Sequence, residues 1–114
     1  MNQACDLQSK RCLPCEGGMP ALTQDKIDIL LTKIHDWKVN AEGTQITRRF
    51  TFKNFYKTMA FVNAVAFIAN QENHHPDMEV GYNYCVMHYT THAVNGLSEN
   101  DFICAAKVDA LGDI

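Results

Sequence analysis

Apolar residues recur every three to four positions in three segments of the chain, which is the period of an α-helix. The first segment follows Thr23, whose hydroxyl suits an N-cap, and we expect its helix to end near His35-Asp36. The second covers residues 54–72 and must stop before a following proline. The third begins after Ser98, with Asp101 placed for a capping box.

Four other segments alternate apolar and polar residues, as half-buried β-strands do. Residues 37–39 and 46–52 flank a turn that contains glycine, so they predict a hairpin. Residues 78–82 and 84–92 predict a second hairpin. In the last strand Cys85, Met87 and Tyr89 share the apolar face, while Thr90 and His92 lie on the other.

These elements follow one another in the order α-β-β-α-β-β-α. Helices that cover one face of a four-stranded antiparallel sheet make a two-layer α+β domain, and this is the fold we expect. We place this single domain at residues 22–114 and interpret residues 1–21 as an irregular N-terminal arm that contains cysteines.

The helix over residues 54–72 has two apolar stripes, and one sheet can cover only one of them. The first and last helices could flank it and cover both stripes. Alternatively, the second stripe is buried against the same helix of another subunit in a homodimer or homotetramer. The stripes consist of Phe55, Met59, Val62, Ala66 and Ala69, and of Phe61, Val65 and Ile68.

Length and charge narrow the possible functions. A chain of 114 residues with 46% apolar and 20% charged residues is an ordinary globular domain. Its net charge is −3 and its basic residues are scattered, apart from Lys10-Arg11 and Arg48-Arg49, so we expect neither nucleic-acid nor membrane-surface binding. Since residues 1–18 lack the apolar segment of a secretory signal, we expect a cytoplasmic protein with reduced thiols.

The arm carries a C-x-x-C pair, Cys12 and Cys15, and a further thiol at Cys5. No second pair of metal ligands lies nearby, and glycines and a proline follow instead of a helix. The arm is therefore either a mobile tail or a structural or redox metal site. The other two cysteines, Cys85 and Cys104, lie on apolar faces and are expected in the core.

Two adjacent histidines, His74 and His75, lie just beyond the central helix and before Pro76. Imidazoles exchange protons near neutral pH, so the pair suits general acid–base catalysis, although a histidine pair on a loop can also be merely solvated. A metal site is a further alternative, but neighbouring side chains of an extended segment point apart. The donors available to such a site are His74, His75, His88, His92, Asp77 and Glu79.

An ordered set of these residues resembles the pterin-4a-carbinolamine dehydratase family. The set comprises His74-His75-Pro76, an aromatic residue at Tyr82, His92 and then Asp101, and the resemblance extends over about Leu22 to Leu111. It also includes Asp36-Trp37, residues 50–55 and residues 96–102. The resemblance implies the same α+β fold.

The resemblance further implies an enzyme that removes water from a 4a-hydroxytetrahydropterin to give quinonoid dihydropterin, and that uses no metal and no organic cofactor. It implies His74, His75 and His92 as catalytic residues, and Trp37, Thr91 and Asp101 as substrate-binding residues. One departure is Asn70, because many members have an acidic residue four positions before the first histidine; the nearest acid here is Glu72.

Proton transfer is the chemistry that this reaction needs. Hydroxide is a poor leaving group, so a general acid must protonate the C4a hydroxyl, and a base must remove the N5 proton. The implied partners are an aromatic amino-acid hydroxylase, whose pterin is recycled, and further copies of the chain. Animal members also act as dimerisation partners of a homeodomain transcription factor, so a non-catalytic interaction protein is the alternative function.

Overall fold

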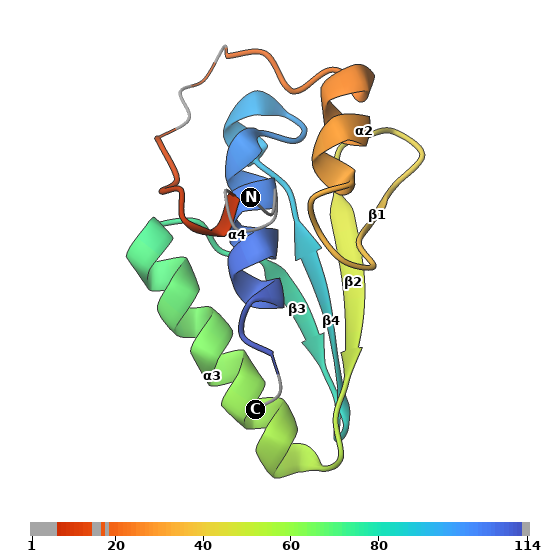
Figure 1. Ribbon diagram of the computed structural model, residues 1–114, viewed down its shortest axis with the longest axis vertical. Helices are drawn as coiled ribbons and strands as arrows, with labels where there is room; N and C mark the ends of the chain where they lie inside the picture. The colour runs from red at the N-terminus through yellow and green to blue at the C-terminus, as the bar shows by residue number, and fades with distance from the viewer. Residues whose placement is uncertain (1–6, 15–16, 18, 113–114) are drawn as a thin grey trace.

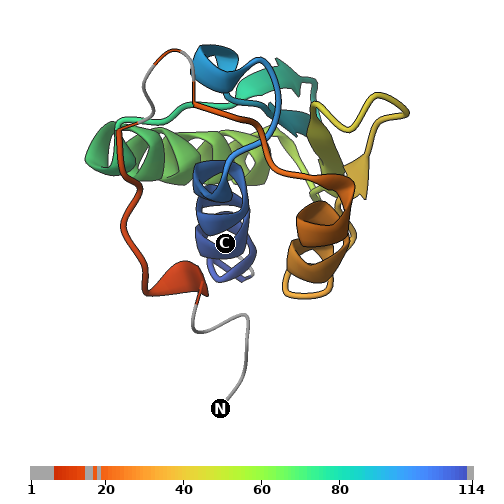
Figure 2. The ribbon, with the colours of Figure 1, turned by 90° about the horizontal axis from the view of Figure 1, so that it is seen from above.

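A four-stranded antiparallel sheet covered on one face by helices is the architecture of the computed structural model, which describes residues 7–14, 17 and 19–112 (Figures 1 and 2). The α+β fold expected from the sequence is confirmed. The helices are α2 (Gln24–Leu31), α3 (Phe55–Glu72) and α4 (Glu99–Asp109). The strands are β1 (Lys38–Val39), β2 (Ile46–Thr51), β3 (Asp77–Val80) and β4 (Tyr84–Tyr89).

The two expected hairpins are present and join at the centre of the sheet. Strand β1 pairs with β2, and β3 pairs with β4, in both cases antiparallel. The strand order is β1-β2-β4-β3, because β2 also pairs with β4, with Phe50 opposite Cys85. The inward face of β4 is apolar as predicted: Cys85, Met87 and Tyr89 are all fully buried.

Helix boundaries follow the local hydrogen bonds. Asn54 caps α3 by accepting from the backbone N–H of Lys57, and Asn73 ends the helix in the left-handed conformation. Helix α2 is shorter than predicted. It ends at Leu31, because Thr32 turns both its N–H and its hydroxyl back to the carbonyl of Ile29.

The last strand also ends early. We predicted that it reaches His92, but β4 stops at Tyr89. Thr91 then pairs with Gly96 in an isolated bridge, and this pairing closes a short 3-10 helix, His92–Val94, between them. His92 therefore lies at the start of a tight turn and not on the face of a strand.

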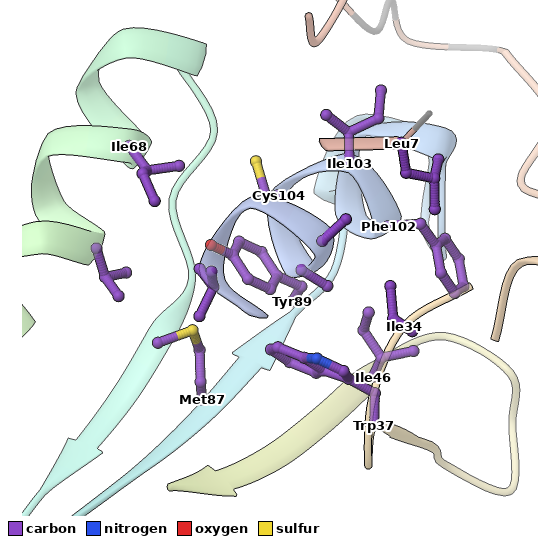
Figure 3. Packing of buried hydrophobic residues seen from close by; sticks show 14 of the residues in the cluster. Leu7, Ile34, Trp37, Ile46, Ile68, Met87, Tyr89, Phe102, Ile103 and Cys104 are labelled. Carbon is purple, nitrogen blue, oxygen red and sulfur yellow. The ribbon is translucent and has the colours of Figure 1, made fainter. Parts of the chain in front are cut away.

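The core lies between the sheet and the helices, and α4 is at its centre (Figure 3). Of the eleven residues of α4, eight are buried, which is far more than one sheet face would bury on an amphipathic helix. The additional cover comes partly from the arm, since Leu7 is only 2% exposed and belongs to the same core.

The described part of the arm is packed on the domain and is not the mobile tail that we considered. Lys107 donates to the carbonyl of Gln8, and the amide of Asn100 donates to the carbonyl of Leu13. Lys10 pairs with Glu99 on the surface. Cys5 and Cys15 lie outside the described residues. Over the residues that the structure covers, no helix is both long and apolar enough to cross a membrane.

Candidate active site

A cavity of about 380 Å³ lies where α3 ends, β3 begins and β4 ends. Four imidazoles line it, and they come from three different segments of the chain. The segment after α3 supplies His74 and His75, β4 supplies His88, and the 3-10 helix supplies His92. The arm contributes one wall through Cys12, Leu13 and Pro14.

His74 is the most constrained of these histidines. Its Nε2 lies 2.7 Å from Oδ1 of Asp101, and its side chain is 13% exposed. Its ring is parallel to that of Tyr89, with an angle of 9° and centroids 5.8 Å apart. When Nε2 carries the proton and donates it to Asp101, Nδ1 of the neutral ring is the nitrogen that can accept a second proton.

Asp101 is held by a set of short hydrogen bonds at the start of α4. Its Oδ2 accepts from the hydroxyl of Thr91 at 2.7 Å and from the backbone N–H of Ser98 at 3.0 Å. The carboxylate is fully buried, but each oxygen is engaged and the first turn of the helix favours negative charge. Asp101 therefore fixes both the position and the tautomer of His74.

His75 and His92 lie at the same cavity and are both exposed. His75 has one weak local contact, between its Nδ1 and the carbonyl oxygen of Pro76 at 3.4 Å. Pro76 itself is buried, and it holds this segment in an extended conformation. These two imidazoles are accessible to a molecule in the cavity and to solvent protons.

His88 is a lining residue that the sequence reasoning named only as a possible metal ligand. Its Nε2 lies 2.7 Å from Oε2 of Glu79, and its Nδ1 lies 2.8 Å from the hydroxyl of Thr47. Both ring nitrogens are thus engaged by the protein. Among the residues that the structure describes, no cluster of three histidine, cysteine or acidic side chains could hold a metal ion.

Trp37, which the resemblance implies as a substrate-binding residue, does not line the cavity. It is buried, and its Nε1 donates to Oδ1 of Asp109 at 2.9 Å. Its ring contacts that of Tyr89 (Figure 3). The ring of Tyr89 in turn stacks on that of His74. Trp37 therefore supports the site from the core, with the ring of Tyr89 between it and His74.

Tyr89 is the residue between them, and its environment keeps it neutral. Burial raises the pKa of its hydroxyl, and the nearby Cys104 and Asp101 raise that pKa further. A neutral phenol next to His74 acts as a rigid apolar surface.

Glu72 is one of two acidic residues that line the cavity, the other being Asp77, and the sequence analysis gave Glu72 no partner. Its side chain is fully buried, and its Oε2 lies 2.9 Å from Nε of Arg11. Its Oε1 accepts from the backbone N–H of Cys12 at 2.7 Å. Asn70, at the usually acidic position, is exposed and does not line the cavity. No local pattern in the sequence could have paired Glu72 with an arm 60 residues away.

The sequence profile of the family described as Pterin 4 alpha carbinolamine dehydratase matches residues 20–111. The chain belongs to this family. A relative from Nitrosomonas eutropha, provisionally named pterin-4-alpha-carbinolamine dehydratase, is 56% identical over 112 residues, or 97% of each chain. One from Legionella pneumophila with the same provisional name is 60% identical over 107 residues, covering 93% of this chain and 95% of the relative.

Solved structures of similar fold have been described under more than one role. A crystal structure from Brucella melitensis, described as a transcriptional coactivator/pterin dehydratase, has a TM-score of 0.77 at 31% identity and covers 80% of this chain and 97% of its own. A pterin dehydratase-like protein described as a RuBisCO assembly factor in the alpha-carboxysome has a TM-score of 0.59 at 27% identity, covering 68% and 92%. Membership of the pterin dehydratase family therefore does not by itself fix the activity.

Proposed function

We propose that the protein dehydrates a 4a-hydroxytetrahydropterin to the quinonoid dihydropterin by general acid–base catalysis. The observation that carries the proposal is the convergence of three imidazoles, His74, His75 and His92, on one cavity. One of them is oriented by the buried carboxylate of Asp101. A cavity of about 380 Å³ is also in the range that small-molecule ligands occupy.

The reaction requires two proton transfers. An imidazolium gives a proton to the C4a hydroxyl, which leaves as water, and a neutral imidazole takes the proton of N5 as the C4a–N5 double bond forms. His74, with Nε2–H directed to Asp101, is suited to take a proton on Nδ1. His75 and His92 are exposed and can recover protons from solvent after each turnover. A well-placed acid or base contributes on the order of 10²–10⁴-fold to a rate.

The substrate and the product of this reaction identify the two classes of enzyme with which the protein would act. A 4a-hydroxytetrahydropterin is the spent form of the cofactor of aromatic amino-acid hydroxylases, and the quinonoid product must be reduced before it can be used again. We propose that the protein acts between such a hydroxylase and a pterin reductase.

The proposal is tested by measuring quinonoid dihydropterin formation from the carbinolamine with the purified protein. We expect His74→Ala and His75→Ala each to lower turnover at least ~10²-fold, because each removes a proton-transfer group outside the core. The matched control is His35→Ala, because His35 is exposed and does not line the cavity. Rates close to wild type in both cavity variants would refute the assignment.

A non-catalytic interaction protein is the second candidate, and one observation favours it. Helix α3 carries three exposed aromatic side chains, Phe55, Tyr56 and Phe67, and two of them, Tyr56 and Phe67, lie on the same side of the helix, where another protein could bind. If the wild-type protein gave no turnover above the uncatalysed rate, this second function would be the better interpretation.

A further inference from the structure

Two thiols from distant parts of the chain meet next to the cavity. Cys12 of the arm and Cys104 of α4 have their Sγ atoms 3.5 Å apart, and both are free thiols. Cys104 Sγ also lies 4.0 Å from the carbonyl oxygen of His74, and Cys12 lines the cavity. This pair is separate from the proton-transfer groups, but it borders them.

The position of Cys12 is fixed by its neighbours on both sides. Its own backbone N–H donates to the buried carboxylate of Glu72. The next residue, Leu13, exchanges two hydrogen bonds with the side chain of Asn100: its N–H donates to Oδ1 at 3.0 Å, and its carbonyl accepts from Nδ2 at 2.6 Å. Because these bonds anchor the arm to both α3 and α4, the two sulfur atoms are held together by the fold.

We propose that Cys12 and Cys104 form a redox-modifiable site, at which two-electron oxidation by a peroxide creates a disulfide that latches the arm onto α4. This disulfide would be a covalent bond between the wall of the cavity and the centre of the core. The proposal depends only on the placement of the two thiols and not on the dehydratase activity.

The two thiols differ in exposure and in pKa, and this difference determines which of them is oxidised first. The hydrogen bond with Cys12, together with burial, raises the pKa of Cys104, so Cys104 keeps its proton. Cys12 is only partly buried and is the thiol that an oxidant can reach. The Cys12 thiol and hydrogen peroxide give a sulfenic acid and water.

The second step closes the bond without further oxidant. The sulfur of Cys104 attacks the sulfur of the Cys12 sulfenic acid, and an S–S bond replaces the S–O bond. The hydroxide that leaves takes the proton of Cys104 and departs as water. The two sulfur atoms have then lost two electrons to one peroxide, and an added dithiol returns them.

The experiment uses the full chain carrying Cys5→Ser and Cys15→Ser, so that neither thiol competes for Cys12. The protein is treated with hydrogen peroxide, digested with trypsin and a glutamyl endopeptidase without reduction, and analysed by mass spectrometry. The second protease cuts at Glu99, which separates Cys85 from Cys104. We expect a peptide pair joined through Cys12 and Cys104, which dithiothreitol separates.

A thermal measurement provides the second readout. Since the crosslink closes a long loop, we expect oxidation to raise the Tm by ~5 °C or more, and reduction to reverse the shift. Cys12→Ser in the same background is the matched control and should show neither the joined peptide nor the shift. Cys104→Ala should leave a Cys12 sulfenic acid that dimedone traps.

Three results would overturn the proposal. These are a disulfide that joins Cys12 to Cys85 or to another chain, oxidation of Cys12 to sulfinic acid with Cys104 still reduced, and the absence of any Cys12 product after treatment with peroxide.

Discussion

At the scale of single residues, the contact between His74 and Asp101 decides what the cavity can do. Asp101 does not line the cavity, and it acts through the imidazole that it orients. Its second oxygen is occupied by Thr91 and Ser98, so the carboxylate cannot rotate away from His74 without breaking two hydrogen bonds. Asp101 is thus a positioning residue.

We predict that Asp101→Asn lowers kcat for carbinolamine dehydration by ~10-fold or more, because an amide no longer stabilises a protonated His74 or fixes its tautomer. The readout that distinguishes positioning from simple loss of fold is the pH profile of kcat, whose His74-dependent limb should move. Glu99→Gln is the matched control, since Glu99 lies in the same first turn of α4 but is exposed, pairs with Lys10 and does not line the cavity. An unchanged profile in Asp101→Asn would contradict the assignment.

Tyr89 allows a second test at this scale. Its hydroxyl is buried and has no hydrogen-bond partner among the residues that the structure describes, whereas its ring packs on both His74 and Trp37. A buried polar group without a partner costs about 1–3 kcal/mol. We therefore predict that Tyr89→Phe keeps or raises the free energy of unfolding, measured by urea denaturation, whereas Tyr89→Leu lowers it. A clear loss of stability in Tyr89→Phe would show that the hydroxyl is satisfied.

At the scale of elements, the sequence predicted α3 most accurately, because the signals that define it are local. Asn54 and Asn73 mark its ends, and apolar spacing runs without interruption between them. The predicted end of α2 was wrong, because a tight turn ends the helix earlier. The 3-10 helix at His92 was not predicted, because it depends on a single bridge between Thr91 and Gly96. Such contacts leave no periodic pattern in a sequence.

The residues of the candidate site could be predicted where they belong to the motif that the family resemblance rests on. The resemblance named His74, His75, His92, Thr91 and Asp101, and the structure brings all five to one place. Trp37 is buried and does not line the cavity, and an aromatic residue in the core cannot be distinguished in a sequence from one at a ligand. The pairing of Glu72 with Arg11 could not be predicted either, because the arm has no apolar periodicity that would place it on the domain.

The arm is an element in its own right, and it can be tested as one. Leu7 lies in the core with α4, so truncating it should leave a cavity there. We predict that Leu7→Ala lowers the free energy of unfolding by about 2–4 kcal/mol, measured by urea denaturation. Leu13→Ala, at a side chain that is 73% exposed, is the matched control and should change it by less than about 0.5 kcal/mol. If Leu7→Ala and Leu13→Ala both changed the free energy of unfolding only slightly, Leu7 would add no stability through its place in the core.

At the scale of the whole molecule, one side of α3 is left exposed to solvent. The buried face of α3 consists of Thr58, Phe61, Val65, Ile68 and Glu72, and it faces the sheet and α4. The opposite face retains Tyr56 at 86% and Phe67 at 68% exposed, three helical turns apart. Of the stripe that includes Phe55 and Ala66, both of these residues are exposed, so α2 and α4 do not cover both stripes in the described part of one chain.

The exposed side chains of Tyr56 and Phe67 lie along one side of α3 and can form a self-complementary surface, because two copies of α3 can pack along each other about a two-fold axis. We therefore expect a homodimer or a dimer of dimers, and we predict that Phe67→Asp lowers the mass found by sedimentation at micromolar concentration. A carboxylate there would be buried without a partner at such a contact, which is strongly unfavourable. Ile29→Asp, at an exposed apolar residue of α2, is the control and should keep the wild-type mass. A wild-type protein that sediments as a monomer at every ionic strength would contradict this prediction.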